Sequence, residues 1–531
     1  MSIGGKFVTS CSHGISRRAL CLAAGAFASL SLLGLSTALA QVNTDNIDLD
    51  ATIQAGIAYG LSGTFDPLSA SGAVTVAANW HTMEGLVDLD PVTRQPYAAL
   101  AAELPSSADG IEYVVKLRDG AVFHDGTPVT AEDVVFSTER VLDPNSNSLF
   151  RSFVSFIDKV EIVDEQTVKF TNKYPFSLFN ERIGSIKIVP KALVEADPEA
   201  FGKLPTGTGP YKLISAVPEA EIVFERNDAY TGNRPALAAD MVWNLIADPT
   251  ARVNALSSGT IQAMEDVPYV DVDAVAAVAE VEKAQSFGLL FAMFDTSKAP
   301  FDDVRVRQAF MYAIDIDQVV GTGMLDNAAP AKGFLPETHP NFHEASVVYT
   351  LNQDKARELL AEAGVPALDI TLMSTDHGWV KDVAPIIKES LDAVGFNTTL
   401  DIGQSGGQYG KVDAGEMQVM IAPGDPSVFG NDPDILMQWW FGDNIWPTTR
   451  YRWADSEGYA DLTALLAEAQ RLSGDEQQAK WNAAMDLIAE QVPLYPLLHR
   501  QLPTAWNADE LEGFVPVPTT GLSFLDVGVK K

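Results

Sequence analysis

The chain has 531 residues, a formal net charge of −35 at pH 7 and two cysteines, Cys11 and Cys21. A chain this acidic repels nucleic acid and anionic membrane surfaces, which excludes nucleic-acid binding as its function. Its length exceeds what one hydrophobic core usually serves, so we expect two or three domains.

The first 40 residues have the pattern of an export signal. Three positive charges flank the start of an apolar stretch at 20–35, and Ala38 and Ala40 form a small-x-small cleavage site. Residues 16–20 (SRRAL) resemble a twin-arginine signal, with an ordinary Sec signal as the alternative. Cleavage near Ala40 removes both cysteines and leaves a formal charge of −38. No disulfide, thiolate nucleophile or cysteine metal ligand then remains.

Beyond the signal, no stretch approaches the ~18 continuous apolar residues of a membrane helix. We therefore expect a soluble protein that is periplasmic or otherwise extracytoplasmic. The first strand is predicted at 51–57, and a helix-like segment ends in the stretch 79–88.

The stretch 116–137 (KLRDGAVFHDGTPVTAEDVVFS) is the most structured part of the sequence. Residues 113–117 are rich in β-branched and aromatic side chains, which predicts a strand. Two Asp-Gly pairs predict turns. Thr130 and Asp133 have the spacing of a capping box and predict the start of a helix.

His124 and Asp125, side by side in this stretch, could be half of a catalytic or metal pair. The turn accounts for Asp125, and His124 has no partner at a metal-ligand spacing. We expect a scaffold role for both. Further along, the glycines at 207–209 are followed by Pro210, which cannot open the helix of a dinucleotide-binding loop. We interpret this segment as a crossing between domains.

The second half of the sequence shows a helix-glycine-strand order twice. Glycine just past a helix supplies a left-handed C-cap, and alternation of helix and strand predicts an α/β lobe with a partly parallel sheet. Two further helices precede the last strands. The predicted elements are a helix at 355–363, Gly364, a strand at 368–373, a helix at 380–394, Gly395, a strand at 397–402 and helices at 461–472 and 475–491.

The residues Gly403-Gln404-Ser405-Gly406-Gly407 match the nucleophile-elbow pattern of hydrolases. That motif requires a helix directly after the serine, and three glycines between 406 and 410 are poor helix formers. We expect a glycine-rich loop that faces a ligand, or merely a flexible loop. An exported serine hydrolase that uses Ser405 is the alternative from another functional class.

The stretch 420–453 contains four tryptophans in a region broken by Gly, Pro and Asp. Such aromatic side chains belong either to a core or to the apolar wall of a small-molecule cleft. Asp425 precedes a proline, so it could form a turn, or it could face the ammonium group of a ligand.

Taken together, these motifs resemble the extracellular solute-binding proteins of family 5, which serve peptide- and nickel-type ABC importers. The resemblance covers essentially the whole chain after the signal. It implies a two-lobed, type II α/β periplasmic-binding-protein fold, with an extra domain inserted in lobe one and the ligand enclosed between the lobes. The stretches that carry it are 79–87, 116–137, 207–211, 300–309 and 355–364.

The resemblance also implies a division of the chain. Lobe one would be built from several separate segments, joined to lobe two by two hinge strands. The predicted segments are 1–40 for the signal, 41–87, 205–287 and 492–531 for lobe one, 88–204 for the inserted domain and 288–491 for lobe two.

Peptide-binding members of the family have a tryptophan-containing loop that ends in an aspartate, which pairs with the amino group of the peptide. Asp425 matches that aspartate, but Ala422 and Pro423 stand where the tryptophan would be. Some dipeptide binders also hold the ligand carboxylate with an arginine, and the nearest cation here is Lys381. The predicted ligand-binding residues are Asp425, Gly424, Gln404, Tyr409, Trp379 and Trp446.

The resemblance implies a binding component, not an enzyme, that delivers an oligopeptide or another amine-bearing solute to the permease of an ABC importer. An oligosaccharide stacked on tryptophan is the alternative ligand, and a nickel chelate is a third. We expect a monomer without cofactor or metal.

Overall fold

The computed structural model describes residues 44–61, 63–146 and 148–531. The predicted export signal, with both cysteines and the cleavage site at Ala40, lies outside these residues. Within the part of the chain that is described, no helix is both long and apolar enough to cross a membrane.

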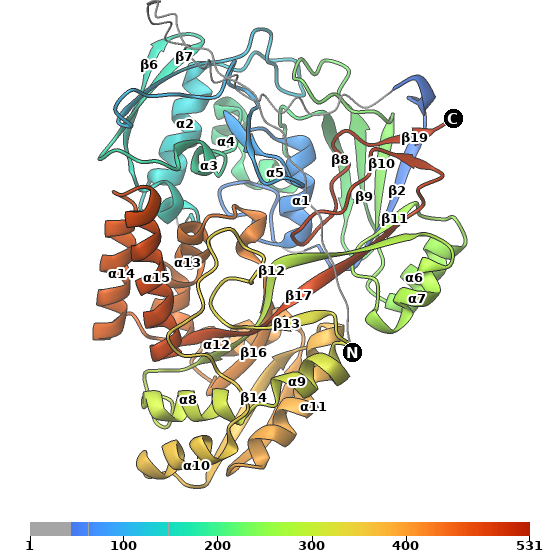
Figure 1. Ribbon diagram of the computed structural model, residues 1–531. Coiled ribbons are helices and arrows are strands. Elements are labelled where there is room, and N and C mark those ends of the chain that lie inside the picture. The colour runs from blue at the N-terminus through green and yellow to red at the C-terminus, as the bar shows by residue number, and fades with distance from the viewer. Residues whose placement is uncertain (1–43, 62, 147) are drawn as a thin grey trace, which may run out of the picture. The chain divides into compact units, whose positions relative to one another are not determined.

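An eleven-stranded mixed sheet is the framework of the fold (Figure 1). The long strands β12 and β17, of 15 and 13 residues, pair antiparallel in its middle. Strand β12 also pairs with β16 in one half of the sheet, and β17 also pairs with β11 in the other half. These two strands therefore connect the two halves. The strands in spatial order are β15 (Phe396–Gly403), β14 (Leu368–Thr375), β16 (Val419–Gly424), β12 (Glu280–Phe294), β17 (Leu494–Trp506), β11 (Ala263–Met264), β2 (Thr52–Ile57), β10 (Asp240–Leu245), β9 (Glu221–Arg226) and β8 (Tyr211–Val217), with β13 (Ala328–Pro330) beside β17.

One half of the sheet has the predicted α/β character. Strand β14 pairs parallel with both β15 and β16. Helices α10 (Gln353–Glu362) and α11 (Gly378–Asp392) precede β14 and β15. Gly364 and Gly395, with φ of 78° and 119°, lie just beyond the two helices in the left-handed region that favours glycine. The predicted helix-glycine-strand order and the parallel pairing are confirmed.

The other half of the sheet packs against α1 (Ala73–Thr82). His81 of this helix is fully buried; its Nδ1 bonds to the carbonyl of Ala77 (2.8 Å), and its Nε2 accepts from the N–H of Phe524 (2.8 Å). Burial lowers the pKa of His81 to about 4, because the charged imidazolium would lose its hydration inside the protein. This neutral histidine ties α1 to the C-terminal segment.

A separate three-stranded antiparallel sheet is formed by β5 (Glu112–Lys116), β7 (Thr167–Asn172) and β6 (Ile157–Asp164). Helix α2 (Ala131–Leu142) begins at the predicted capping box, in which the Thr130 N–H donates to Asp133 Oδ2 (3.0 Å). A hairpin of β3 (Val87–Leu89) and β4 (Pro96–Ala98) lies before this sheet in the chain.

His124 and Asp125 have structural roles, as expected. The N–H of Gly207 donates to His124 Nδ1 (3.2 Å), so the ring carries its proton on Nε2 and donates it to the carbonyl of Gly209 (3.1 Å). Burial lowers the pKa of His124 to about 4. Asp125 accepts from the N–H of Thr127 (2.9 Å) and thereby closes a turn.

The remaining elements surround these sheets. A small sheet near the C-terminus has the order β1 (Ile47–Asp48), β19 (Gly528–Lys530), β18 (Leu511–Glu512). The other helices are α3 (Phe179–Ile183), α4 (Lys191–Ala196), α5 (Pro198–Lys203), α6 (Pro249–Ser257), α7 (Val272–Ala276), α8 (Val304–Ala313), α9 (Ile316–Gln318), α12 (Ser405–Asp413), α13 (Pro433–Phe441), α14 (Glu457–Ala469) and α15 (Gly474–Gln491), with short 3₁₀ or π turns η1 (Thr44–Asn46), η2 (Arg151–Val154), η3 (Tyr269–Asp271), η4 (Val319–Gly323), η5 (Pro426–Val428) and η6 (Trp446–Arg450).

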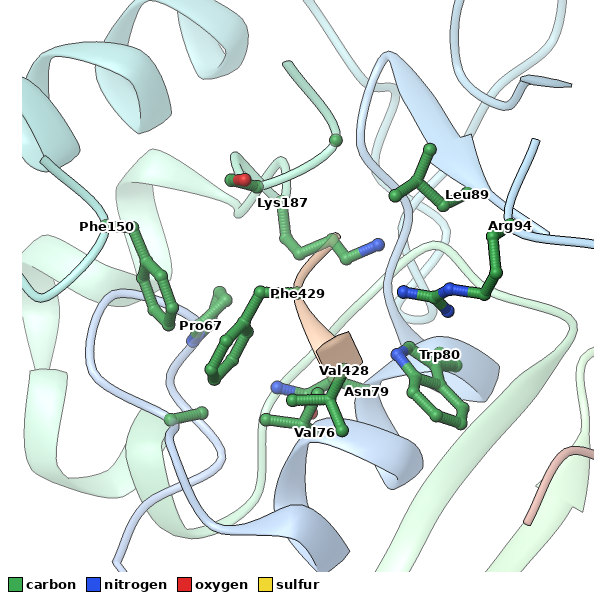
Figure 2. A pocket seen from close by; sticks show the side chains of 13 residues that line it. Pro67, Val76, Asn79, Trp80, Leu89, Arg94, Phe150, Lys187, Val428 and Phe429 are labelled. Carbon is green, nitrogen blue, oxygen red and sulfur yellow. The ribbon is translucent and has the colours of Figure 1, made fainter. Parts of the chain in front are cut away.

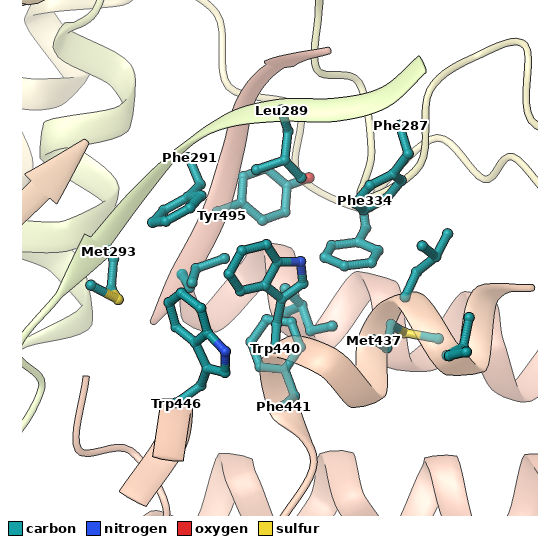
Figure 3. Close-up of a cluster of buried hydrophobic side chains, with 14 of the residues drawn as sticks. Phe287, Leu289, Phe291, Met293, Phe334, Met437, Trp440, Phe441, Trp446 and Tyr495 are labelled. Carbon is teal, nitrogen blue, oxygen red and sulfur yellow. The ribbon is translucent and has the colours of Figure 1, made fainter. Parts of the chain in front are cut away.

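Most of the tryptophan-rich stretch belongs to the core. Trp440 lies among aromatic side chains of β12 and β17 (Figure 3), and its ring is 5.0 Å from Phe291 and 4.5 Å from Trp446. Trp446 and Trp453 are also buried. The core interpretation therefore accounts for three of the four tryptophans, and Trp439 is half-buried.

A fully buried arginine joins α3 to the start of α13. Arg182 donates to Asp432 and to Asp434, each at 2.6 Å. Paired and hydrogen-bonded in this way, the three charges are tolerated inside the protein. The domain boundaries predicted at 88, 205, 288 and 492 stay a prediction.

Candidate functional site

A cavity of about 540 Å³ lies where β12 and β17 cross from one half of the sheet to the other. Its size is that of a site for a small ligand. Its walls come from segments far apart in the chain: the loop after β2, the start of α1, the middle of β12, the starts of α11 and α12, the β16–η5 corner, α13, η6, β17 and the C-terminal segment.

Asp425, at the end of β16, faces this cavity and caps η5. Its Oδ1 accepts from the N–H (3.3 Å) and hydroxyl (2.5 Å) of Ser427. Its Oδ2 accepts from the N–H (2.9 Å) and hydroxyl (2.9 Å) of Thr520 and more weakly from Thr519 (3.4 Å). Two fixed N–H donors and three hydroxyls that can rotate hold the side chain of Asp425 in place.

Gly424 lets the aromatic core approach Asp425 closely. A Cβ atom on Gly424 would lie 2.5 Å from the Trp440 ring, which is closer than such contacts allow. Gly288 has a similar function on β12, where a Cβ would lie 3.4 Å from Asp425 Oδ2, 3.4 Å from Arg500 Cγ and 2.7 Å from Ser286 Oγ. The two glycines thus give the backbone beside Asp425 its shape, and Asp425 and Arg500 flank the same point of β12.

Arg500 of β17 contributes a buried cation to the cavity wall. It forms an ion pair with Asp266, donates to the Tyr59 hydroxyl (3.3 Å) and lies over the Trp379 ring, 4.9 Å from its centroid. Beside this group, Glu265 accepts from the N–H of Ala58 (3.0 Å), and burial raises the pKa of Glu265 to about 7.

Arg450 contributes a second cation, from η6. Its guanidinium lies over two aromatic rings, 4.2 Å from the centroid of Trp446 and 4.6 Å from that of Tyr409. Its single carboxylate contact is Nε to Asp413 Oδ1 at 3.2 Å, and the Asp413 side chain is 37% exposed. The cation is therefore held in place by stacking while its counter-ion stays in contact with solvent.

The family model for bacterial extracellular solute-binding proteins, family 5 (middle), matches residues 95–459. The chain belongs to this family. The glutathione-binding protein GsiB of Escherichia coli (strain K12) is 28% identical over 477 residues, which cover 88% of this chain and 92% of that protein.

Solved structures show the same fold. The protein AgaA from A. tumefacien R10, in complex with agropinic acid, has a TM-score of 0.81 at 25% identity and covers 91% of this chain and 99% of its own. The protein DppA from Helicobacter pylori, in complex with the peptide STSA, has a TM-score of 0.81 at 22% identity, with 92% and 99% covered. The fold is the two-lobed type II fold of periplasmic binding proteins, and the protein is a binding component of an ABC importer, not an enzyme.

Five of the six predicted ligand-binding residues line the cavity of this solute-binding protein. They are Asp425, Gly424, Tyr409, Trp379 and Trp446. Gln404 is not among the lining residues; it is the N-cap of α12, and its neighbour Ser405 reaches the cavity instead. Lys381, the nearest cation in the sequence, is exposed on α11 and does not line the cavity.

One local prediction was wrong. The glycine-rich segment after Gln404 is not a loop but α12, which begins at Ser405. Gln408 anchors this helix by donating to the carbonyls of Asp401 (2.6 Å) and Ser374 (3.1 Å), and Lys411 pairs with Asp401 (2.7 Å). These contacts offset the weak helix propensity of the glycines.

Sequence reasoning missed both cavity arginines. Arg450 stands inside the tryptophan-rich stretch, so its neighbours could have indicated it. Arg500 gave no such signal, because its ion-pair partner is 234 residues away. Within the described residues, no group of three or more His, Cys, Asp or Glu side chains could hold a metal ion.

Proposed function

We propose that this solute-binding protein captures a solute that carries both a primary amine and a carboxylate, such as an oligopeptide or a glutathione-like peptide. The single observation that carries this proposal is the charge pattern of the cavity, one aspartate together with two arginines stacked on aromatic rings. The captured solute is delivered to the membrane permease of the importer.

Asp425 is the partner of the amine. A carboxylate offers about four acceptor positions, and three of its five donors here are hydroxyls that can turn away. An ammonium group that takes the place of the Thr520 hydroxyl gains a charge-assisted hydrogen bond and keeps the two fixed N–H contacts intact.

Arg450 and Arg500 are the partners of carboxylates. A guanidinium binds a carboxylate through two parallel N–H groups, and stacking on a ring leaves its edge free for this contact. Arg450 is the better anchor of the two, because its contact with Asp413 uses only Nε. Arg500 is already paired with Asp266, so it contributes mainly positive potential.

The tryptophans give weaker support to an oligosaccharide ligand. Sugar rings bind by stacking on an open aromatic face. Here the guanidinium of Arg450 covers a face of Trp446, and that of Arg500 covers a face of Trp379. Trp440 is buried in the core. The Trp446 and Trp379 rings therefore position cations, which leaves only the half-buried Trp439, among the described cavity tryptophans, as a stacking surface for a sugar.

The architecture supports closure on the ligand by hinge motion. Strands β12 and β17 are the two connections beside the cavity, and their register shifts between Gln285 and Leu289. We propose that this irregular segment is the hinge, with lobe two at 288–491 and the inserted domain at 88–204. We further propose that the protein is a periplasmic monomer, exported by a twin-arginine signal that is cleaved near Ala40.

Calorimetric titration of the purified chain tests the ligand class. The probes are glutathione and the dipeptide glutamyl-alanine, with maltotriose as a neutral sugar of similar size. The proposal predicts saturable binding of at least one of the two amine-bearing probes and no binding of maltotriose. Binding of maltotriose alone would contradict it.

A further inference from the structure

A second cavity, of about 70 Å³, lies next to the ligand cavity. Val428 and Phe429, directly after the β16–η5 corner, line both cavities and so form the partition between them. Most of its other walls are apolar and include Val76, Trp80 and Leu89 (Figure 2). We call it the Arg94 pocket, because Arg94 reaches into it from the β3–β4 turn.

Among the described residues, Arg94 has no carboxylate partner. Its Nη2 donates to the carbonyl of Ser427, while its buried Nε has no hydrogen-bond partner in the part of the chain that is described. The two carboxylates whose charge acts on it are engaged elsewhere: Asp90 pairs with Arg234 (2.8 Å), and Asp425 accepts from hydroxyl and backbone donors. Burial lowers the pKa of Arg94 to about 10, so at neutral pH it remains charged.

The backbone of Arg94 indicates that this placement is costly. Its φ of 60° lies in the left-handed region, which an arginine rarely adopts. The turn is held by Asp90, whose Oδ1 accepts from the N–H groups of Val92 (3.1 Å) and Thr93 (2.6 Å). A strained turn that places a half-buried guanidinium with an unsatisfied Nε next to a binding cavity points to a ligand contact rather than to a contribution to stability.

Two more polar groups around the pocket also lack a hydrogen-bond partner among the residues that the structure describes. Asn79 is 4% exposed, and its Oδ1 has no hydrogen bond, although its Nδ2 donates to the carbonyl of Phe65 (3.0 Å). The buried hydroxyl of Ser185 has no partner either. Lys187, whose ammonium also ends in the pocket, pairs with Asp88 (2.5 Å). Buried polar groups are normally satisfied, and two of these three, the Arg94 Nε and the Ser185 hydroxyl, are donors that an anionic occupant would satisfy.

We propose that the Arg94 pocket is a subsite for a carboxylate on a short apolar arm of the solute whose amine binds at Asp425. Arg94 and Ser185 supply donors for the anion, and the apolar walls contact the arm. The inference rests on the proposed function, since Asp425 fixes the amine.

The arm must branch close to the amine. Arg94 donates to the carbonyl of Ser427, and Ser427 in turn donates its N–H and its hydroxyl to Asp425. Arg94 and Asp425 therefore contact the same residue. An acidic side chain on the amino-terminal residue of a peptide meets this requirement. Because Val428 and Phe429 separate the cavities, one of these side chains has to rotate when the arm inserts.

The first test compares glutamyl-alanine with glutaminyl-alanine by calorimetry, since the two dipeptides differ only in whether the arm is charged. The wild-type chain is expected to prefer glutamyl-alanine by roughly 10-fold or more, the value of a hydrogen bond to a charged group. Arg94→Met is expected to weaken glutamyl-alanine much more than glutaminyl-alanine, so that the preference is lost, and Arg94→Lys restores part of the preference. Equal wild-type affinities, or a preference that survives in Arg94→Met, would overturn the inference.

The second test does not depend on the amine site. Butyrate, with butyramide as the uncharged control, is added at millimolar concentration in a thermal-unfolding assay. Because Arg450 also binds carboxylates, the comparison is made in the Arg450→Met background. Butyrate, but not butyramide, is expected to raise the Tm of Arg450→Met and not that of the double variant Arg450→Met with Arg94→Met. No shift in Arg450→Met, or the same shift in the double variant, refutes the subsite. If neither dipeptide binds while butyrate behaves as expected, the proposed solute is wrong and the pocket stands.

Discussion

Replacing Asp425 by asparagine removes the charge that we assign to the solute amine while keeping the side-chain shape. An amide has one acceptor oxygen, so it can accept from the Thr520 N–H (2.9 Å) or from the Ser427 N–H (3.3 Å), but not from both. The shorter contact is kept, and the Ser427 N–H then faces an amide N–H₂. We expect a loss of about 1–3 kcal/mol in the free energy of unfolding from this mismatch.

The effect on binding is separate from this loss. A hydrogen bond to a charged group contributes about 1.5–3 kcal/mol, so Kd for glutamyl-alanine should rise roughly 10- to 150-fold in Asp425→Asn. The assay is calorimetric titration of both chains with glutamyl-alanine and with its N-acetylated form. Acetylation removes the ammonium, so it should weaken binding to the wild type and have little effect on the variant, which completes a double-mutant cycle.

The cycle also provides the refutation. If acetylation weakens binding equally in both chains, the coupling free energy is zero and Asp425 does not contact the amine. A variant that binds the unmodified dipeptide as tightly as the wild type would refute the assignment directly. Differential scanning calorimetry of the free chains measures the stability loss independently, so that a folding defect is not mistaken for lost binding.

Three further changes test other parts of the account. Arg450→Met should raise Kd for glutamyl-alanine roughly 10-fold or more and leave Kd for its C-terminal amide unchanged; equal losses for acid and amide in calorimetry would contradict the carboxylate role. His124→Gln cannot keep both ring contacts to the 207–209 segment, so the Tm should fall while the ranking of ligands in titrations stays the same; a changed ranking at unchanged Tm would overturn the scaffold role. His81, with a native pKa of about 4 against 6.5 when unfolded, binds its proton more readily in the unfolded chain. Its contribution to stability is present above pH 6.5 and is lost as pH falls toward 4, so His81→Gln should flatten the decline of Tm in that window, and an unchanged slope would contradict this.

Several helix ends could be predicted because their signals are local. Gly364 and Gly395 end helices through their own φ angles, and Thr130 with Asp133 starts a helix through contacts three residues apart. These features need no knowledge of the rest of the chain. The family resemblance of the sequence also pointed to Asp425, which lines the cavity; its contact with a ligand amine stays a prediction.

The rest of the site depends on contacts between distant segments. Arg500 appears in the sequence as a lone charge in an apolar strand, and only folding brings it to Trp379 and Asp266. Helix α12 forms despite its glycines because Gln408 reaches two carbonyls of neighbouring strands. Arg94 lies in a turn with no sequence signal of its own, and its place beside Ser427 depends on a contact across 333 positions.

The central claim is that the cavity selects a solute with both an amine and a carboxylate. Native mass spectrometry of the protein purified from its own host, followed by fragmentation of the released ligand, tests it most directly. The account predicts a peptide-like solute that contains a free primary amine and at least one free carboxylate. A neutral oligosaccharide or a metal chelate without an amine would contradict it.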